Sequence, residues 1–406
     1  MLSDKTIANI VACLIVVMLT TRITIACATY SMWFVVLLLI YFFIRTKNRN
    51  LSFYMQGLFL LPKEIYAGIF IFYFSLFIAS AINLDVPGLK KTLDFITWTI
   101  PLWLILITAG RYKITTGIKY GIAVGTMYLC GNGLFQFYQG YSAGNTSIRI
   151  QANFWNANLL AMALEILFPL LVVFTMEEQV KIKKIFFFLL SLITFICLYL
   201  TQSRGALGGI VLAYIVSGGI YLFEARMMTS KTKLRKALGV FCVGILIMGA
   251  SLGYLAVQRY NPNDNRFGAE RGIMYESSLK MWEDNKLAGV GVASWNKAYN
   301  GKYQPEYYED KGHFHPHNMF LNYLSTAGII GEVGFILYLI LLFKGGYKCI
   351  KQSNNLINLF LIFTPLMAYL FHGFLDDTLV HKEIARLFYL ILGIIIIYCR
   401  QSMKTQ

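Results

Sequence analysis

Residues 313–343 read HFHPHNMFLNYLSTAGIIGEVGFILYLILLF. Three of the chain's five histidines stand at alternate positions and lead directly into an apolar segment at residues 318–343. A helix needs about 20 predominantly apolar residues to cross the hydrocarbon core of a bilayer. The stretch therefore predicts a membrane-spanning helix with a group of titratable side chains at one membrane surface.

The composition of the whole chain fits this interpretation. Of its 406 residues, 57% are hydrophobic and 14% are charged, whereas soluble domains carry roughly 25% charged residues. We therefore predict an all-α integral membrane protein with about 12 transmembrane helices. The apolar segments lie at about residues 7–21, 29–45, 65–83, 92–109, 117–137, 156–176, 184–201, 205–223, 237–257, 318–343, 356–373 and 385–400.

The net charge of +16 could indicate a nucleic-acid partner, but its distribution indicates membrane topology instead. With the N-terminus inside, 21 of the 36 lysines and arginines fall in short loops or tails on one side, and seven fall in short loops on the other. Short cytoplasmic loops carry this excess, whereas long loops cross the membrane largely regardless of charge. We expect both termini in the cytoplasm and no nucleic-acid partner.

One long polar segment, residues 258–316, separates two membrane domains, 1–257 with about nine helices and 317–406 with about three. Loops this long are usually functional or disordered, and the many aromatic residues argue against disorder. In ERGIMYESSLKMWEDNKLAGVGVASW, residues 270–295, Met274, Ser278, Met281 and Trp282 share one helical face. We predict an amphipathic helix of about 15 residues whose apolar face lies on the membrane domain or on lipid head groups.

Two arginines on the outer side are candidates for anion binding. Arg204, in TQSRGALGG, lies between two apolar runs at the edge of the hydrocarbon, where a charge marks a functional site or an ion pair. The alternative is that Arg204 extends its side chain to the lipid head groups without a specific role. Arg271 lies near the start of the loop helix, where the alternative is a surface charge. Because a guanidinium matches phosphate oxygens two at a time, the pair suggests an anionic lipid head group such as a pyrophosphate.

The histidines belong to the same outer surface. Histidine titrates near neutrality, so the cluster indicates proton transfer, metal binding or a pH switch. Pro316 predicts that His317 lies on the first helical turn and that His313 and His315 lie on the incoming loop. The H-x-H-x-H spacing also allows a metal site in which Asp376 or Asp377 supplies oxygen ligands.

These motifs resemble those of a known family. HN-MFLNYLSTA-GIIG, from His317 to Gly331, resembles the signature of the bacterial O-antigen ligases. LTQSRGAL around Arg204 and R-x-x-M-Y-E at Arg271 are similar to the two arginine motifs of that family, in the same order along the chain. The resemblance covers roughly residues 198–335.

The resemblance implies a glycosyltransferase of the GT-C type in the bacterial inner membrane. Such an enzyme moves a glycan from undecaprenyl pyrophosphate to the lipid A-core oligosaccharide on the periplasmic face, without a nucleotide or metal cofactor. It implies that His317 is the general base and that Arg204 and Arg271 hold the pyrophosphate. His315 and Asn318 are implied in substrate binding.

Other functions stay open on the sequence alone. The same superfamily includes O-antigen polymerases and O-linked protein glycosyltransferases, so the motifs indicate the reaction better than the acceptor. A twelve-span transporter of polyprenyl-linked glycans is an alternative from another class. Transporters usually show repeated halves and charges near the membrane midplane. Here the halves do not match, and Asp94 and Glu165 lack obvious partners.

Overall fold

The computed structural model describes residues 3–21, 33, 35–41, 44, 55–110, 112–140, 149–228, 244, 246–247, 249–251, 253–254, 266–308, 312–353 and 357–402, and within these ranges it has helices and no strand. The elements are α1 (Asp4–Thr21), η1 (Met55–Leu60), α4 (Lys63–Ile82), α5 (Val86–Trp98), α6 (Ile100–Ala109), α7 (Thr115–Tyr138), α8 (Ala157–Glu177), α9 (Lys181–Leu200), α10 (Arg204–Met228), α12 (Arg266–Asp284), α13 (Trp295–Ala298), η2 (Tyr299–Tyr303), α14 (Met319–Ser353), α15 (Ile357–Gly373) and α16 (Lys382–Ser402).

Seven spans within the described residues are long and apolar enough to cross a membrane, which makes the chain a multi-pass membrane protein. They are α1, α4, α5 with α6, α8, α9, the first part of α10 and most of α14. The expected segments at 117–137, 356–373 and 385–400 are also helical, as α7, α15 and α16. Most of the segments at 29–45 and 237–257 lies outside the described residues.

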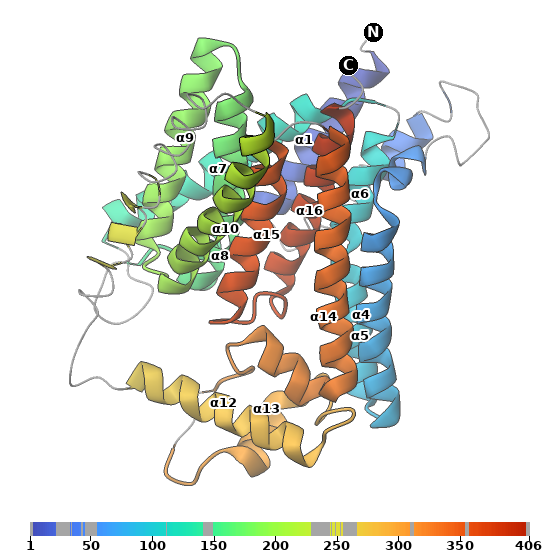
Figure 1. Cartoon of the computed structure of the whole chain (residues 1–406), viewed down its shortest axis with the longest axis vertical. Coiled ribbons are helices and arrows are strands. Elements are labelled where there is room, and N and C mark those ends of the chain that lie inside the picture. Colours follow the sequence, from blue (N-terminus) through green and yellow to red (C-terminus); the bar gives the residue numbers. More distant parts are fainter. Residues whose placement is uncertain are drawn as a thin grey trace.

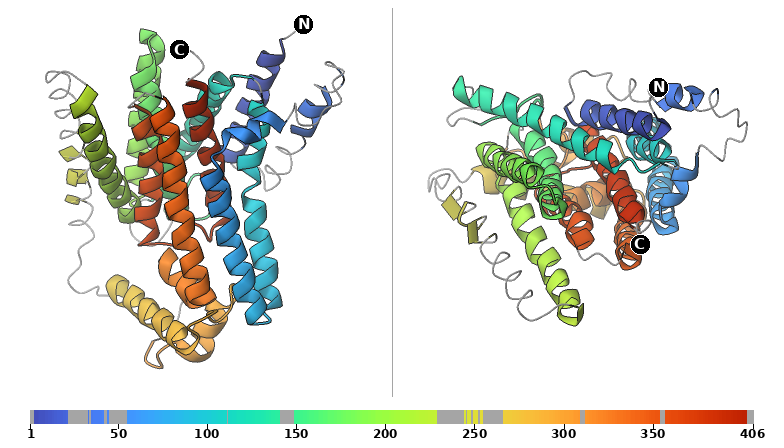
Figure 2. Two further views of the ribbon diagram at one scale, coloured as in Figure 1. Left: turned by 45° about the vertical axis from the view of Figure 1, so that its right-hand side comes forward. Right: turned by 90° about the horizontal axis from the view of Figure 1, so that it is seen from above.

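The bundle is organised around α16, which is buried almost throughout from Ile384 to Cys399. A helix that is apolar on every side packs in the interior of a bundle. Around it, α4 lies along α14 and α10 lies along α15 (Figures 1 and 2). The second pair approaches closely because a Cβ atom on Gly209 would lie 2.8 Å from the Ala368 carbonyl oxygen. This contact brings the start of α10 beside the end of α15.

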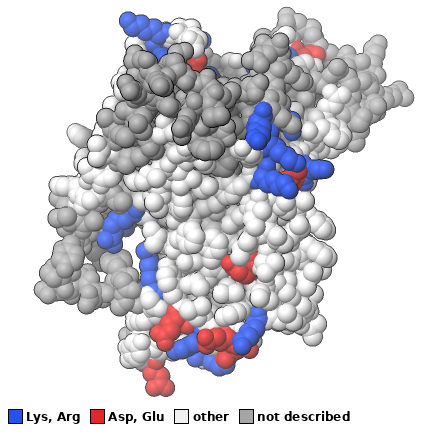
Figure 3. Space-filling model, in the orientation of Figure 1, with Lys and Arg blue, Asp and Glu red and all other residues white. Residues whose placement is uncertain are grey.

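The two ends of the molecule differ. Both termini lie at one end, the terminal end, whereas α12 and α13 form a layer across the other, the loop end (Figures 1 and 2). On the face shown in Figure 3, most charged side chains lie toward these two ends, and a few interrupt the largely uncharged surface between them. This arrangement fits a bundle whose middle lies in hydrocarbon.

The predicted loop helix is present as α12, with 19 residues. Its buried face is made by Met274 and Met281, which pack with Trp295 and Tyr299 in a small core separate from that of the bundle. The rings of Trp295 and Tyr299 are stacked with their centroids 4.8 Å apart. The expectation that this face lies on the membrane domain or on lipid is therefore met only in part, because α12 lies against α14 but Met274 and Met281 pack within the loop layer itself.

The loop layer is fastened to α14 at a break in that helix. Gly328 has φ 63° and ψ −161°, which no α-helix contains. Backbone groups left without intrahelical partners at the break bond to residues 286–291 of the loop layer. The bonds run from Val290 N–H to Ser325, from Gly291 N–H to Thr326 and from Ile329 N–H to Lys286, each 2.9 Å.

Candidate active site

His317 lies immediately before α14 rather than on its first turn. Asn318 caps the helix, because its side-chain oxygen accepts hydrogen bonds from the N–H groups of Phe320 and Leu321, each 3.0 Å. His317 has φ 53°, a left-handed conformation that side chains rarely adopt and that clusters at functional sites. The predicted position on the first turn is wrong because the cap, and not Pro316, sets the helix start.

The imidazole of His317 is oriented by a buried carboxylate. Nδ1 of His317 lies 2.9 Å from Oδ1 of Asp376, whose side chain is 5% exposed. Burial alone would raise the pKa of Asp376, but the hydrogen bond from His317 and the neighbouring imidazoles outweigh it and hold the pKa well below its ordinary value. Nδ1 therefore donates to an ionised carboxylate, and Nε2 keeps the lone pair that can accept a proton.

The turn between α15 and α16 holds Asp376 in place. Its N–H donates to the carbonyl of His372 at 2.9 Å, and its Oδ1 accepts the N–H of Asp377 at 2.8 Å. Asp377 is also buried and accepts the N–H groups of Leu379 and Val380. Burial and the charge of Asp376 raise the pKa of Asp377 to about 7. Sequence reasoning considered Asp376 only as a metal ligand and missed its contact with His317.

Tyr275 connects the loop layer to this centre. Its hydroxyl lies 3.3 Å from the carbonyl oxygens of both His317 and Phe374. Burial raises the pKa of Tyr275, and the positive charge of Arg271 opposes that shift. Arg271 stands one turn before Tyr275 on α12, so the same helix that contacts the backbone of His317 brings this arginine to the site.

Arg204 reaches the site from the opposite side. It is the exposed first residue of α10, and its neighbour Gly205 lies against the ring of His372, where a Cβ atom would approach Cδ2 to 2.7 Å. His372 in turn pairs with Glu165, with 2.9 Å between Nδ1 and Oε2. The expectation that Glu165 lacks a partner is therefore wrong. Its partner is distant in sequence.

The structure thus brings the predicted motifs to one end of the bundle without joining their side chains. Among the described residues, neither Arg204 nor Arg271 forms an ion pair, and no hydrogen bond joins either guanidinium to His317. At one end of the bundle, two guanidinium groups without acidic partners in the described structure can bind an anion, and the carboxylate-oriented imidazole can accept a proton.

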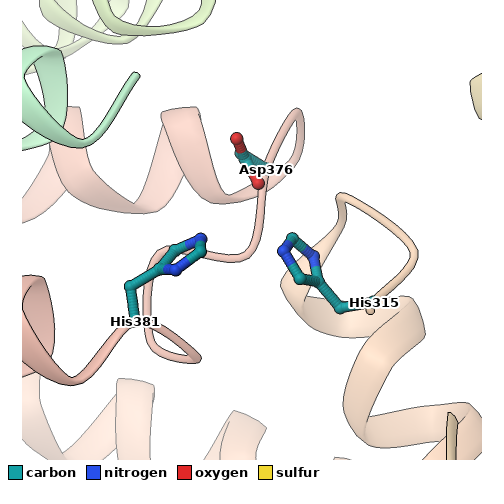
Figure 4. Close-up of side chains that lie close together, drawn as sticks. All are labelled: His315, Asp376 and His381. Atoms are coloured by element: carbon teal, nitrogen blue, oxygen red, sulfur yellow. The ribbon is translucent and has the colours of Figure 1, made fainter. Parts of the chain in front are cut away.

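All five histidines of the chain lie at or beside this centre. His315, Asp376 and His381 place one potential ligand atom each within 4.8 Å of one another (Figure 4). Burial lowers the pKa of His315 to about 3 and also lowers the pKa of His381. The predicted alternation of three histidines is therefore not the grouping that forms. The cluster contains His381 instead of His313 and His317. Because His381 is far along the sequence from His315, the sequence pattern around the histidines could not predict it.

A comparison with protein families matches residues 189–336 to the family described as O-antigen ligase. Residues 189–336 therefore carry the O-antigen ligase domain of that family. This O-antigen ligase domain runs from within α9 into α14, so it contains Arg204, Arg271, His317 and the break at Gly328. Asp376 lies beyond it. None of the curated proteins compared with the chain matches it.

Proposed function

We propose that the chain is an O-antigen ligase that transfers a glycan from undecaprenyl pyrophosphate to the lipid A-core oligosaccharide. The 2.9 Å contact between His317 and Asp376 carries this proposal, because it provides a proton acceptor inside the family region. Members of the family are glycosyltransferase-like ligases and polymerases, so the chemical step is transfer of a glycan.

In this mechanism Nε2 of His317 accepts the proton of the acceptor hydroxyl. The hydroxyl oxygen forms a bond to the anomeric carbon of the glycan, and the bond from that carbon to the pyrophosphate oxygen breaks. Asp376 stabilises the imidazolium through Nδ1–H. A positioned base typically accelerates such a step by about 10²- to 10⁴-fold.

Arg204 and Arg271 bind the pyrophosphate and stabilise the charge that grows on it as it leaves. Fixed cations in a site shielded from water are often the largest single contribution to catalysis. The described structure supports this role because neither arginine has an acidic partner to neutralise it. The lipid pyrophosphate is already an activated donor, so the proposal needs no nucleotide. Asn318 and His315 are the remaining proposed substrate-binding residues, and both lie in the loop before α14.

The location proposed for this reaction is the periplasmic face of the inner membrane. The bias of basic residues predicts cytoplasmic termini, and the loop end lies opposite the terminal end. A polymerase or an O-linked protein glycosyltransferase would use the same donor site with another acceptor. A transporter is less well supported, because the family match and the oriented histidine both favour a catalysed transfer reaction.

The test is transfer by the purified full-length chain supplied with a lipid-linked glycan. Lipid A-core and a second lipid-linked glycan are offered as acceptors in separate reactions, and products are identified by mass spectrometry. Transfer to lipid A-core supports the ligase. Transfer to the second lipid-linked glycan alone would make the chain a polymerase, and no transfer to either acceptor or to an acceptor peptide would contradict the proposed reaction.

A further inference from the structure

Three side chains beside His317 converge without bonding to one another. His315 comes from the loop before α14, whereas Asp376 and His381 come from the turn between α15 and α16. Their potential ligand atoms lie within 4.8 Å of one another, and Figure 4 shows the two rings and the carboxylate directed toward a common space. Within the described part of the chain, no hydrogen bond joins any two of them.

Two of these side chains have nitrogen or oxygen atoms that make no hydrogen bond within the described residues. The imidazole of His381 is partly buried and has no hydrogen-bond partner among the described residues. Asp376 uses Oδ1 for His317 and for the N–H of Asp377, and Oδ2 has no partner within the same residues. Both groups therefore keep a lone pair that can accept an additional ligand in the space between them.

We propose that His315, Asp376 and His381 form a binding site for a divalent cation of the zinc class. Two imidazoles and one carboxylate are a known zinc ligand set, which leaves a fourth position for water. Bonds of about 2.0–2.2 Å place tetrahedral ligand atoms roughly 3.3 Å apart, so the three atoms need to approach by at most about 1.5 Å. Side-chain rotation can provide that movement.

Binding of a cation at this site changes the hydrogen bonding around His317. At present the N–H of His317 donates to Nδ1 of His315 at 3.2 Å. A neutral imidazole has a single lone pair, so coordination of a cation by His315 displaces this contact. The cation instead joins the loop that carries His317 to the turn that carries Asp376. This role concerns the assembly of the site and does not depend on which transfer reaction the site performs.

The experiment measures zinc bound to the full-length chain, purified in detergent through a tag without histidine. After treatment with a chelator and its removal, Zn²⁺ is added alone, excess is removed, and metal per chain is determined by mass spectrometry. We expect about one zinc per chain for the native sequence and for His313→Ala, the matched control in the same loop. His315→Ala and His381→Ala should weaken binding more than the roughly 10- to 100-fold typical of losing an outer-shell partner.

Thermal unfolding provides a second measurement. Zinc should raise the unfolding temperature of the native chain and of His313→Ala, and should leave that of His381→Ala unchanged. Equal zinc retention in all variants, or equal loss in His313→Ala, would overturn the proposal. If the variants do not fold, Co²⁺ bound to the native chain decides, because four-coordinate Co²⁺ shows intense visible absorption. Absence of those bands contradicts the site.

Discussion

Glu165 of α8 and His372 of α15 form a buried pair directly behind Asp376. Oε2 of Glu165 lies 2.9 Å from Nδ1 of His372, and the side chains are 0% and 2% exposed. The carbonyl of His372 accepts the N–H of Asp376, and its ring lies against Gly205. One residue, His372, therefore links α8 and the start of α10 through its ring and the turn that holds the carboxylate through its carbonyl.

Removing His372 should destabilise the protein strongly. His372→Ala leaves Glu165 buried without a partner, a change that typically costs about 3–5 kcal/mol. The double substitution Glu165→Ala/His372→Ala should cost less than the sum of the single ones, because no unpaired group is left. Thermal unfolding in detergent measures all three. Strict additivity would show that the two side chains do not stabilise each other.

Substitution of the proposed base should abolish transfer without unfolding the chain. We expect His317→Ala to lower turnover by about 10²- to 10⁴-fold, because the acceptor proton then has no receiver. Asp376→Asn should fall between this variant and the native enzyme, since an amide oxygen can still accept from Nδ1 but carries no charge. His313→Ala is the matched control. Near-native turnover of His317→Ala in the purified assay would remove the assignment.

The arginines should not tolerate replacement by lysine. Arg204→Lys and Arg271→Lys keep the charge but lose the paired geometry that suits phosphate oxygens. A hydrogen bond to a charged group contributes about 1.5–3 kcal/mol, so each variant should lose roughly 10- to 100-fold in kcat/KM. Lys297→Gln removes an exposed cation of the same layer and should have little effect. Native rates in both lysine variants would contradict pyrophosphate binding by these residues.

The break in α14 should depend on the absence of a side chain. At Gly328 a Cβ atom would lie 2.4 Å from the backbone of Leu287, and the φ and ψ angles belong to a region that is essentially reserved for glycine. Gly328→Ala should therefore lower the unfolding temperature by several degrees. Gly272→Ala, in α12 with no neighbour within 4 Å, should stabilise by about 0.5–1 kcal/mol. Similar behaviour of the two variants would mean that the break is not required.

The loop end and the terminal end should face opposite compartments. Ala293 is exposed in the loop layer, and Thr116 is exposed at the start of α7, near the N-terminal end of α1. In a background without native cysteines, Ala293→Cys should react with a membrane-impermeant thiol reagent applied from the periplasm, and Thr116→Cys should not. The reverse pattern would place the histidines in the cytoplasm and exclude a periplasmic ligase.

The apolar segments could be located from sequence because length and hydropathy are local properties. Residues 318–343 predict most of α14, which runs from Met319 to Ser353. The break at Gly328 could not be predicted, because glycine occurs in many continuous membrane helices. What distinguishes this one is the backbone of residues 286–291, about 40 residues earlier, which supplies the bonds.

The site shows the same division. His317, Arg204 and Arg271 could be identified as candidate site residues from sequence, because a charged or titratable side chain on the predicted outer side of the membrane is energetically costly or functional. Their partners could not be selected, since Asp376 and His381 reach the cluster only through the packing of α15 and α16. The rule based on Pro316 also misplaced His317, because the helix begins after Asn318, whose side chain provides the cap.

The bonds between α14 and residues 286–291 impose an order on biogenesis. Inside hydrocarbon, backbone groups without partners cost several kcal/mol each, so a newly inserted α14 has to remain a continuous helix while it is alone. With the loop end in the periplasm, as proposed, its break can form only after the preceding loop has crossed the membrane and its backbone has arrived to take over the bonds. In that topology, maturation of this end of the protein follows translocation, and an insertion intermediate should lack the break that the finished protein has.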